Sequence, residues 1–175
     1  MLVPYKFRPD NMLEQKIKNR RFGDDSDVNK KIEQTETMLT WVKDPKVMKK
    51  GIKKAVSLLS LYPERTLREV GVELGEALSF LDDVHYKSRV EAALVKVARN
   101  YADRIGGKAL QEMSVGNNWY VRWLSTWIIN NMAYEDPDHV PSDQLDVLVS
   151  DEDVRVKEFA RRVSNRIEKL KVSQL

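Results

Sequence analysis

The chain contains no cysteine among its 175 residues. Disulfide bonds, thiol nucleophiles and thiolate metal sites are therefore excluded together. Long apolar runs are also missing, because no stretch approaches the roughly 20 residues that a membrane span needs. The first residues, Met1 to Lys6, are too polar for a secretory signal. We therefore expect a cytoplasmic protein with no membrane partner.

Signals for β-strands are scarce as well. The sequence has no Asn-Gly or Asp-Gly hairpin turn and no sustained alternation of apolar and polar residues. Most of its seven glycines and six prolines fall between segments with helical periodicity. With 42% hydrophobic and 33% charged residues, the composition is that of a folded globular chain. The sequence thus predicts an all-α fold.

The charge of the chain is unevenly spread along the sequence. Residues 1–60 carry 14 Lys or Arg against 8 Asp or Glu, whereas residues 61–175 carry 16 against 19. We expect residues 1–26 to form a basic N-terminal arm with a short helix, and residues 27–175 to form one helical repeat domain. The excess of +6 in the first 60 residues suggests an acidic partner for that part.

A short phrase recurs at a fixed interval of 33 residues. Ser88-Arg89, Val121-Arg122 and Val154-Arg155 each stand near the start of a helical segment and follow a short polar turn. A looser copy lies upstream at Asp44 to Met48. A period of this length is typical of stacked helical hairpins, in which neighbouring units cover each other's apolar faces. The second helices of four such pairs would begin near residues 45, 84, 117 and 151.

The C-terminal third resembles HEAT repeats. Its first helix ends in Leu145 to Val149, an acidic turn follows, and Val154-Arg155 opens the second helix. The resemblance implies a right-handed α-solenoid of about four HEAT-like helical hairpins. It also implies a ladder of hydrogen bonds between turn Asp residues and the arginines that follow. Asp151 or Asp153 with Arg155 matches that ladder best, and Arg89 and Arg122 would be the preceding rungs.

The segment from residue 119 to 133 is apolar around most of its circumference. Tyr120, Trp123 and Trp127 form one stripe at helical spacing. One interpretation is a central helix buried between neighbouring repeats. The other is that the tryptophans reach a surface and anchor a partner, as Trp and Arg often do at interfaces. The candidate partner-binding residues are Arg89, Arg122, Trp123, Trp127 and Arg155.

A group of lysines follows the first of the repeated turns. These residues share one broad face of the expected helix, and no acidic residue between Pro45 and Tyr62 balances them. A solvated helix face explains them, but bound phosphate groups would also neutralise their mutual repulsion. The candidate phosphate-binding residues are Lys46, Lys49, Lys50, Lys53 and Lys54.

The sequence shows no signature of a catalytic or metal site. It has no phosphate-binding glycine loop, nucleophile elbow or histidine–glutamate zinc motif. The acidic loop around Asp136 lacks the spacing of a calcium loop, and His85 and His139 are far apart. Some HEAT-like proteins excise DNA bases with an Asp among aromatic residues, but the segment from 119 to 133 contains no Asp. We expect no catalysis, cofactor, metal or small-molecule substrate.

Two functions remain from these patterns. The first is a non-catalytic binding or scaffold module that presents its second helices to a protein partner. The alternative is a nucleic-acid-binding protein that contacts phosphates through the lysine-rich face.

Overall fold

Every regular element in the computed structural model is a helix, within the residues that it describes, 26–40 and 44–175. The predicted arm therefore lies outside the described residues, apart from Ser26. The all-α prediction is confirmed for the described ranges. The helices are α2 (Ser26–Thr40), α3 (Pro45–Leu61), α4 (Pro63–Leu81), α5 (Val84–Asn100), α6 (Gly107–Val115), α7 (Trp119–Glu135), α8 (Ser142–Leu148) and α9 (Val154–Ser173), with a short 3-10 helix, η2 (Pro137–His139).

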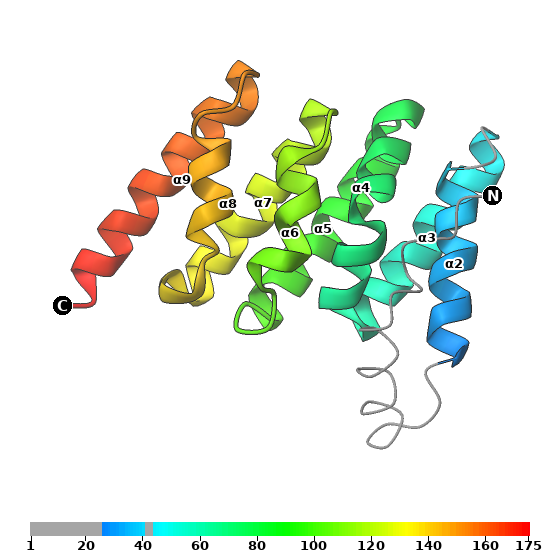
Figure 1. The fold of residues 1–175 in the computed structure, drawn as a ribbon, viewed down its shortest axis with the longest axis horizontal. Helices are drawn as coiled ribbons and strands as arrows, with labels where there is room; N and C mark the ends of the chain where they lie inside the picture. Colours follow the sequence, from blue (N-terminus) through cyan, green and yellow to red (C-terminus); the bar gives the residue numbers. More distant parts are fainter. Residues whose placement is uncertain (1–25, 41–43) are drawn as a thin grey trace.

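The helices lie in two parallel rows (Figure 1). Helices α2, α4, α6 and α8 pack in succession and form the first row. Helices α3, α5, α7 and α9 do the same behind them and form the second row. Consecutive helices alternate between the rows, so each pair joined by a short turn contributes one helix to each row.

Helices of the second row all begin at a short polar side chain. Asp44, Asp83, Asn118 and Asp153 are the N-caps of α3, α5, α7 and α9, and each accepts a hydrogen bond from a backbone N–H of the first helical turn. Such caps satisfy donors that the helix itself leaves unpaired and stabilise each helix by about 1 kcal/mol. The regular turn chemistry of the sequence therefore sets where the second-row helices start.

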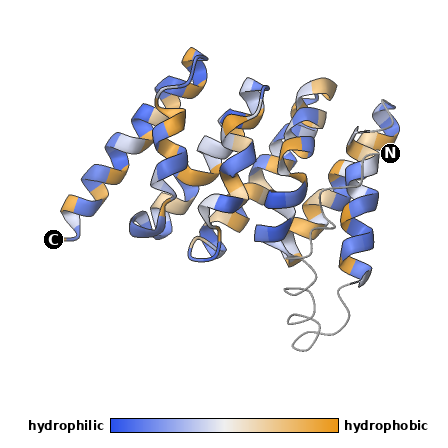
Figure 2. Cartoon of the chain, viewed as in Figure 1, coloured by the Kyte–Doolittle hydropathy of each residue, from blue (hydrophilic) through white to orange (hydrophobic). Residues whose placement is uncertain are grey.

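The core lies between the rows, and α7 is its central helix. Val121, Leu124, Ile128, Ile129 and Met132 of α7 are at most 1% exposed. Each helix carries both hydrophilic and hydrophobic residues along its length (Figure 2), as an amphipathic helix packed on one side does. The interpretation of residues 119–133 as a buried central helix is confirmed for this stripe of the helix.

Two glycines of α4 permit close contact with the helices beside it. A Cβ atom at Gly75 would lie 2.8 Å from Cγ2 of Val121, and one at Gly71 would lie 2.8 Å from Sδ of Met113. Both glycines are buried. The i,i+4 spacing of these glycines thus marks the face on which α4 approaches α6 and α7.

None of the helices within the described ranges is long and apolar enough to cross a membrane.

Candidate binding surface

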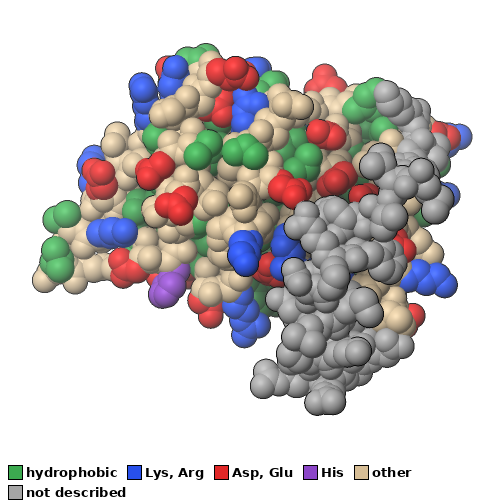
Figure 3. Space-filling model, in the orientation of Figure 1, with side chains coloured by type: hydrophobic (Ala, Val, Ile, Leu, Met, Phe, Trp, Pro, Cys, Tyr) green, Lys and Arg blue, Asp and Glu red, His purple; other side chains and the backbone are tan. Residues whose placement is uncertain are grey.

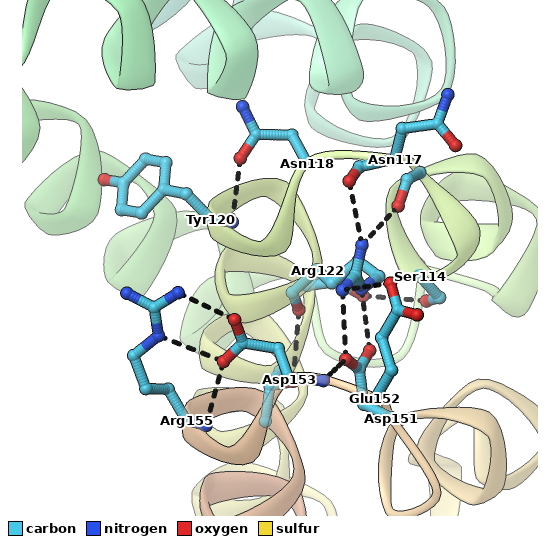
Figure 4. Close-up of polar contacts among 12 residues, drawn as sticks. Ser114, Asn117, Asn118, Tyr120, Arg122, Asp151, Glu152, Asp153 and Arg155 are labelled. Carbon is cyan, nitrogen blue, oxygen red and sulfur yellow. Dashed lines mark hydrogen bonds and ion pairs between the residues drawn. The ribbon is translucent and has the colours of Figure 1, made fainter.

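Arg122 links two neighbouring helical hairpins from a buried position in α7. Its Nε donates to Oδ2 of Asp151 at 2.7 Å and its Nη2 donates to Oδ1 at 3.0 Å (Figure 4). Nη1 donates to the backbone oxygens of Gly116 and Asn117 at 2.7 and 3.1 Å. The Arg122 and Asp151 side chains are only 8% and 4% exposed. The guanidinium therefore ties the α6–α7 turn to the α8–α9 turn.

The electrostatics of this link stabilise the charged guanidinium. The hydrogen bond to Asp151 raises the pKa of Arg122, and burial opposes that rise. Glu152 adds a longer ion pair, with its Oε1 3.6 Å from Nη2. Asp151 also has a partner in its own turn, because its Oδ1 accepts from the N–H of Asp153 at 2.8 Å. The carboxylate thus shapes its own turn while it binds the arginine.

The other two arginines of the 33-residue period have different surroundings. Arg155 pairs with Asp153 of its own helix start, with Nη2 2.7 Å from Oδ2, and its guanidinium lies 3.5 Å from the ring centroid of Trp119. The hydrogen bond to Arg155 lowers the pKa of Asp153 to about 2. Arg89 is exposed and has no ion pair with any residue in the described ranges.

These contacts therefore differ in detail from the ladder that the resemblance to HEAT repeats implies. The link between hairpins joins Arg122 to Asp151, whereas the Arg155–Asp153 pair stays within one turn. Arg89 meets no equivalent carboxylate at the next turn, because that turn carries Asn117 and Asn118. A neutral amide carries no charge to pair with a guanidinium, so Arg89 remains on the surface.

The aromatic side chains of α7 and α9 form a stacked group, which we call the aromatic ladder. Tyr120 stacks on Trp123 with ring centroids 6.0 Å apart and planes 9° apart. Trp123 stacks on Trp127 at 5.6 Å and 11°. Phe159 of α9 lies tilted against both tryptophans, at 5.6 and 6.3 Å. Both indoles are half-buried, and each has the other indole and Phe159 as ring neighbours.

Helix α5 holds the other side of the aromatic ladder through Glu91. The Tyr120 hydroxyl donates to Oε1 of Glu91 at 3.2 Å, and Nε1 of Trp127 donates to the Glu91 backbone oxygen at 3.5 Å. Burial, with the nearby charge of Glu91, raises the pKa of Tyr120. The ladder thus joins α5, α7 and α9 across the second row.

Basic side chains lie against aromatic rings at both ends of α7. Lys87 of α5 lies 4.9 Å from the Tyr120 ring. Tyr134, at the other end of α7, lies between Arg99 of α5 at 5.2 Å and Arg166 of α9 at 4.4 Å. Cations from α5 and α9 therefore flank α7 at both ends.

The lysines of α3 divide into two groups. Lys49 is half-buried; its Nζ lies 3.5 Å from Oδ2 of Asp83 and 5.1 Å from the Tyr86 ring. The other four are exposed. Three of them, with Lys31 of α2, line an open hollow of about 420 Å³. The exposed members are Lys46, Lys50, Lys53 and Lys54.

The two rows of helices differ strongly in charge. The helices of the second row contain 17 Lys or Arg and 4 Asp or Glu, a net +13. Those of the first row contain 5 against 10, a net −5. The segments that connect the helices within the described ranges add one Arg and nine acidic residues. The described residues are thus neutral in total, with their positive charge concentrated in one row. Asp and Glu side chains are spread over the face seen in Figure 3.

This segregation is invisible when the sequence is divided into halves. Successive helices alternate between the rows, so any long stretch of sequence averages the two charges. Adding up the charges of alternate predicted helices would have revealed the difference from the sequence.

Comparison of the chain with protein-family models, curated proteins and solved structures found no match. Within the described ranges, no group of three or more His, Asp or Glu side chains is placed to hold a metal ion.

Proposed function

We propose that the two rows form a right-handed HEAT-like α-solenoid of four helical hairpins. Three features support this architecture. Each row packs in sequence order, every second-row helix begins at an Asp or Asn cap, and the Arg122–Asp151 pair links successive turns. Such arrays expose one row of helices as an extended binding surface.

The function that we propose is non-catalytic binding of nucleic acid through the second row. The observation that carries this proposal is the charge difference between the rows, +13 against −5. Phosphate groups at regular spacing would neutralise lysines and arginines that have few acidic neighbours in their own row. The exposed residues available for this contact come from α3, α5 and α9. They include Lys46, Lys50, Lys53, Lys54, Arg89, Lys96, Arg161 and Arg162.

The aromatic ladder has a structural part in this proposal. Trp123 is stacked with both Tyr120 and Trp127, and Phe159 lies against both indoles, so these rings already have ring partners within the protein. Binding through the second row would therefore depend on the phosphate backbone, which carries no sequence information directly. Arg122 is likewise committed to Asp151 and the turn backbone and contributes rigidity to the array.

An acidic protein would be attracted to the same row by the same charges. Our first expectation names a protein partner, and Arg89 and Arg155 would be exposed to a protein bound on this row. Phosphate and carboxylate polyanions can be distinguished by direct competition. We therefore treat the acidic protein as an alternative outcome of the experiment below.

The experiment compares two double variants with the same loss of charge. Lys53→Gln with Arg162→Gln removes two cations from the second row, and Lys30→Gln with Lys108→Gln removes two from the first row. All four side chains are exposed. Binding to a fluorescent DNA duplex is measured by anisotropy over a series of salt concentrations.

We expect only the second-row variant to bind more weakly. Its plot of log affinity against log salt should become less steep by about 0.9 for each phosphate that the variant no longer neutralises. Equal affinity of the two variants would contradict the assignment of the binding face. A wild-type protein that binds polyglutamate and no oligonucleotide at low salt would assign the second row to an acidic protein instead.

A further inference from the structure

The second row contains a hollow between α3 and α5, which we call the α3–α5 hollow. Its volume is about 760 Å³, within the roughly 300–1,000 Å³ of typical ligand sites. It is lined by residues of α3 and α5 and by the residue that follows α5.

The α3–α5 hollow is lined by both apolar and cationic side chains. Small apolar side chains, Val56, Ala92 and Ala93, leave room for a flat ring. The charged groups, Lys96 and Arg99, are both cationic and exposed, and no Asp or Glu lines the hollow. The site therefore combines an apolar surface with donors for an anion.

Neutral polar groups complete the lining. Ser60 and Asn100 are both exposed. The Ser60 hydroxyl donates to the Val56 backbone oxygen at 3.3 Å and so offers an acceptor, whereas the Asn100 amide can donate and accept. A ligand that fits this set has a planar ring with polar edges and an attached phosphate. A nucleotide has all of these parts.

We propose that the α3–α5 hollow holds one unpaired nucleotide of a single-stranded nucleic acid. The base lies against Val56, Ala92 and Ala93, and its phosphate lies near Lys96. This inference rests on the proposed function, because it needs a strand held along the second row. A base in a duplex stays within its stack and cannot reach the hollow without the cost of unstacking and unpairing.

Neighbouring cations give the strand a route from the hollow across α7. Arg99 lines the hollow and also lies 5.2 Å from the ring of Tyr134. Arg166 of α9 lies against the same ring at 4.4 Å. Positive charge thus continues from α5 to α9 past the end of α7, where the next phosphates of the strand would pass.

The test uses two variants of the hollow and a matched control for each. Ala92→Leu fills the apolar wall, and Lys96→Gln removes the cation. Gln111→Leu and Lys108→Gln make the same kinds of change on α6, in the first row. All four residues are exposed, so the fold should be retained, and circular dichroism melting curves would verify this.

The probes are an oligothymidylate strand and a duplex, each of about 12 nucleotides. Probes of this length are long enough to cross the second row from α3 to α9, whose three helix-to-helix spacings cover roughly 27 Å. We expect the wild-type protein to bind the single strand at least five-fold more tightly than the duplex, a ratio that corresponds to about 1 kcal/mol. Ala92→Leu should abolish this preference and leave the duplex affinity unchanged. Lys96→Gln should weaken single-strand binding about three- to ten-fold.

The outcomes separate this inference from the proposed function. If the wild-type protein binds neither probe at low salt, the proposed function fails and the inference fails with it. If it binds both probes equally, or if Ala92→Leu matches Gln111→Leu on the single strand, only the inference is overturned. An equal loss on both probes in Ala92→Leu would also overturn it, because an unpaired base would then have no specific part.

Discussion

Replacement of Arg122 by Ala should destabilise the protein more than replacement of any exposed arginine. The guanidinium makes two hydrogen bonds to the Asp151 carboxylate and two to backbone oxygens of the α6–α7 turn. Alanine removes all four and leaves the 4%-exposed carboxylate without its counter-charge. Breaking a buried ion pair from one side typically costs about 3–5 kcal/mol, because the remaining charge is left uncompensated.

The expected change is large enough to measure in two ways. Urea unfolding followed by circular dichroism should give a free energy of unfolding lower by about 3–5 kcal/mol. In a protein of this size each kcal/mol lowers Tm by about 2–4 °C, so Tm should fall by roughly 6 to 20 °C. If the array loses its cooperativity, the hairpins on either side of Arg122 would unfold in separate steps.

Two further variants isolate the cause. Arg155→Ala removes an exposed arginine from the equivalent position of the next repeat and should have only a small effect, because water screens its pair with Asp153. The double variant Arg122→Met with Asp151→Leu should recover much of the stability, since two apolar side chains leave no buried charge. A loss below about 1 kcal/mol in Arg122→Ala would refute the assignment of this residue to the link between hairpins.

Three other predictions concern packing and pH. Gly75→Ala should lower the free energy of unfolding by about 1–3 kcal/mol, because the new methyl meets the branched side chain of Val121. Gly71→Ala should be nearly neutral, because the flexible Met113 side chain can move and alanine favours helix. Similar urea midpoints for the two variants would contradict this difference. Trp123→Ala should lower the free energy of unfolding by about 2–3 kcal/mol, because the ring supports the aromatic ladder. Its affinity for the duplex, measured below Tm, should stay within about two-fold of the wild-type value. A loss of binding without a loss of stability would show instead that Trp123 contacts the partner. The pKa of Asp153 is about 2 in the folded protein, below its ordinary 3.8, so its contribution is present above about pH 4 and is lost as pH falls through about 2. Asp153→Asn keeps the cap. The Tm of this variant should be lower than that of the wild-type protein at pH 6, and the difference should shrink as pH falls through about 2; a constant difference would contradict the pKa assignment.

The helical elements could be predicted well because their signals are local. Asp44 and Asp83 each stand directly before an apolar-periodic segment, which is the position of an N-cap, and both cap helices in the structure. The end of α5 is not marked in the sequence. No Gly or Pro lies between Val84 and Ile105, but α5 ends at Asn100 and the chain turns before Gly106. Its C-terminal turns contain no strong breaker until the glycines, so local propensity gives little indication of the earlier stop.

The candidate site was harder to predict because equivalent sequence positions acquired different neighbours. The 33-residue period places Arg89, Arg122 and Arg155 at the same point of successive repeats. Only Arg122 faces a carboxylate across the turn, since the partner is supplied by the following repeat and varies from Asn to Asp. A period identifies the repeated unit but not the contact between two units.

The sequence by itself determined the helical nature of the described chain, its repeat and the caps that begin the second-row helices, because these depend on residues a few positions apart. Tertiary packing placed α3, α5, α7 and α9 side by side, and so gathered their net charge of +13 into one row. It also placed Phe159 of α9 against Trp123 and Trp127 of α7, and it buried Arg122 while Arg89 stayed exposed. Those properties depend on which side chains from separate helices come together in space, and no stretch of sequence contains that information on its own.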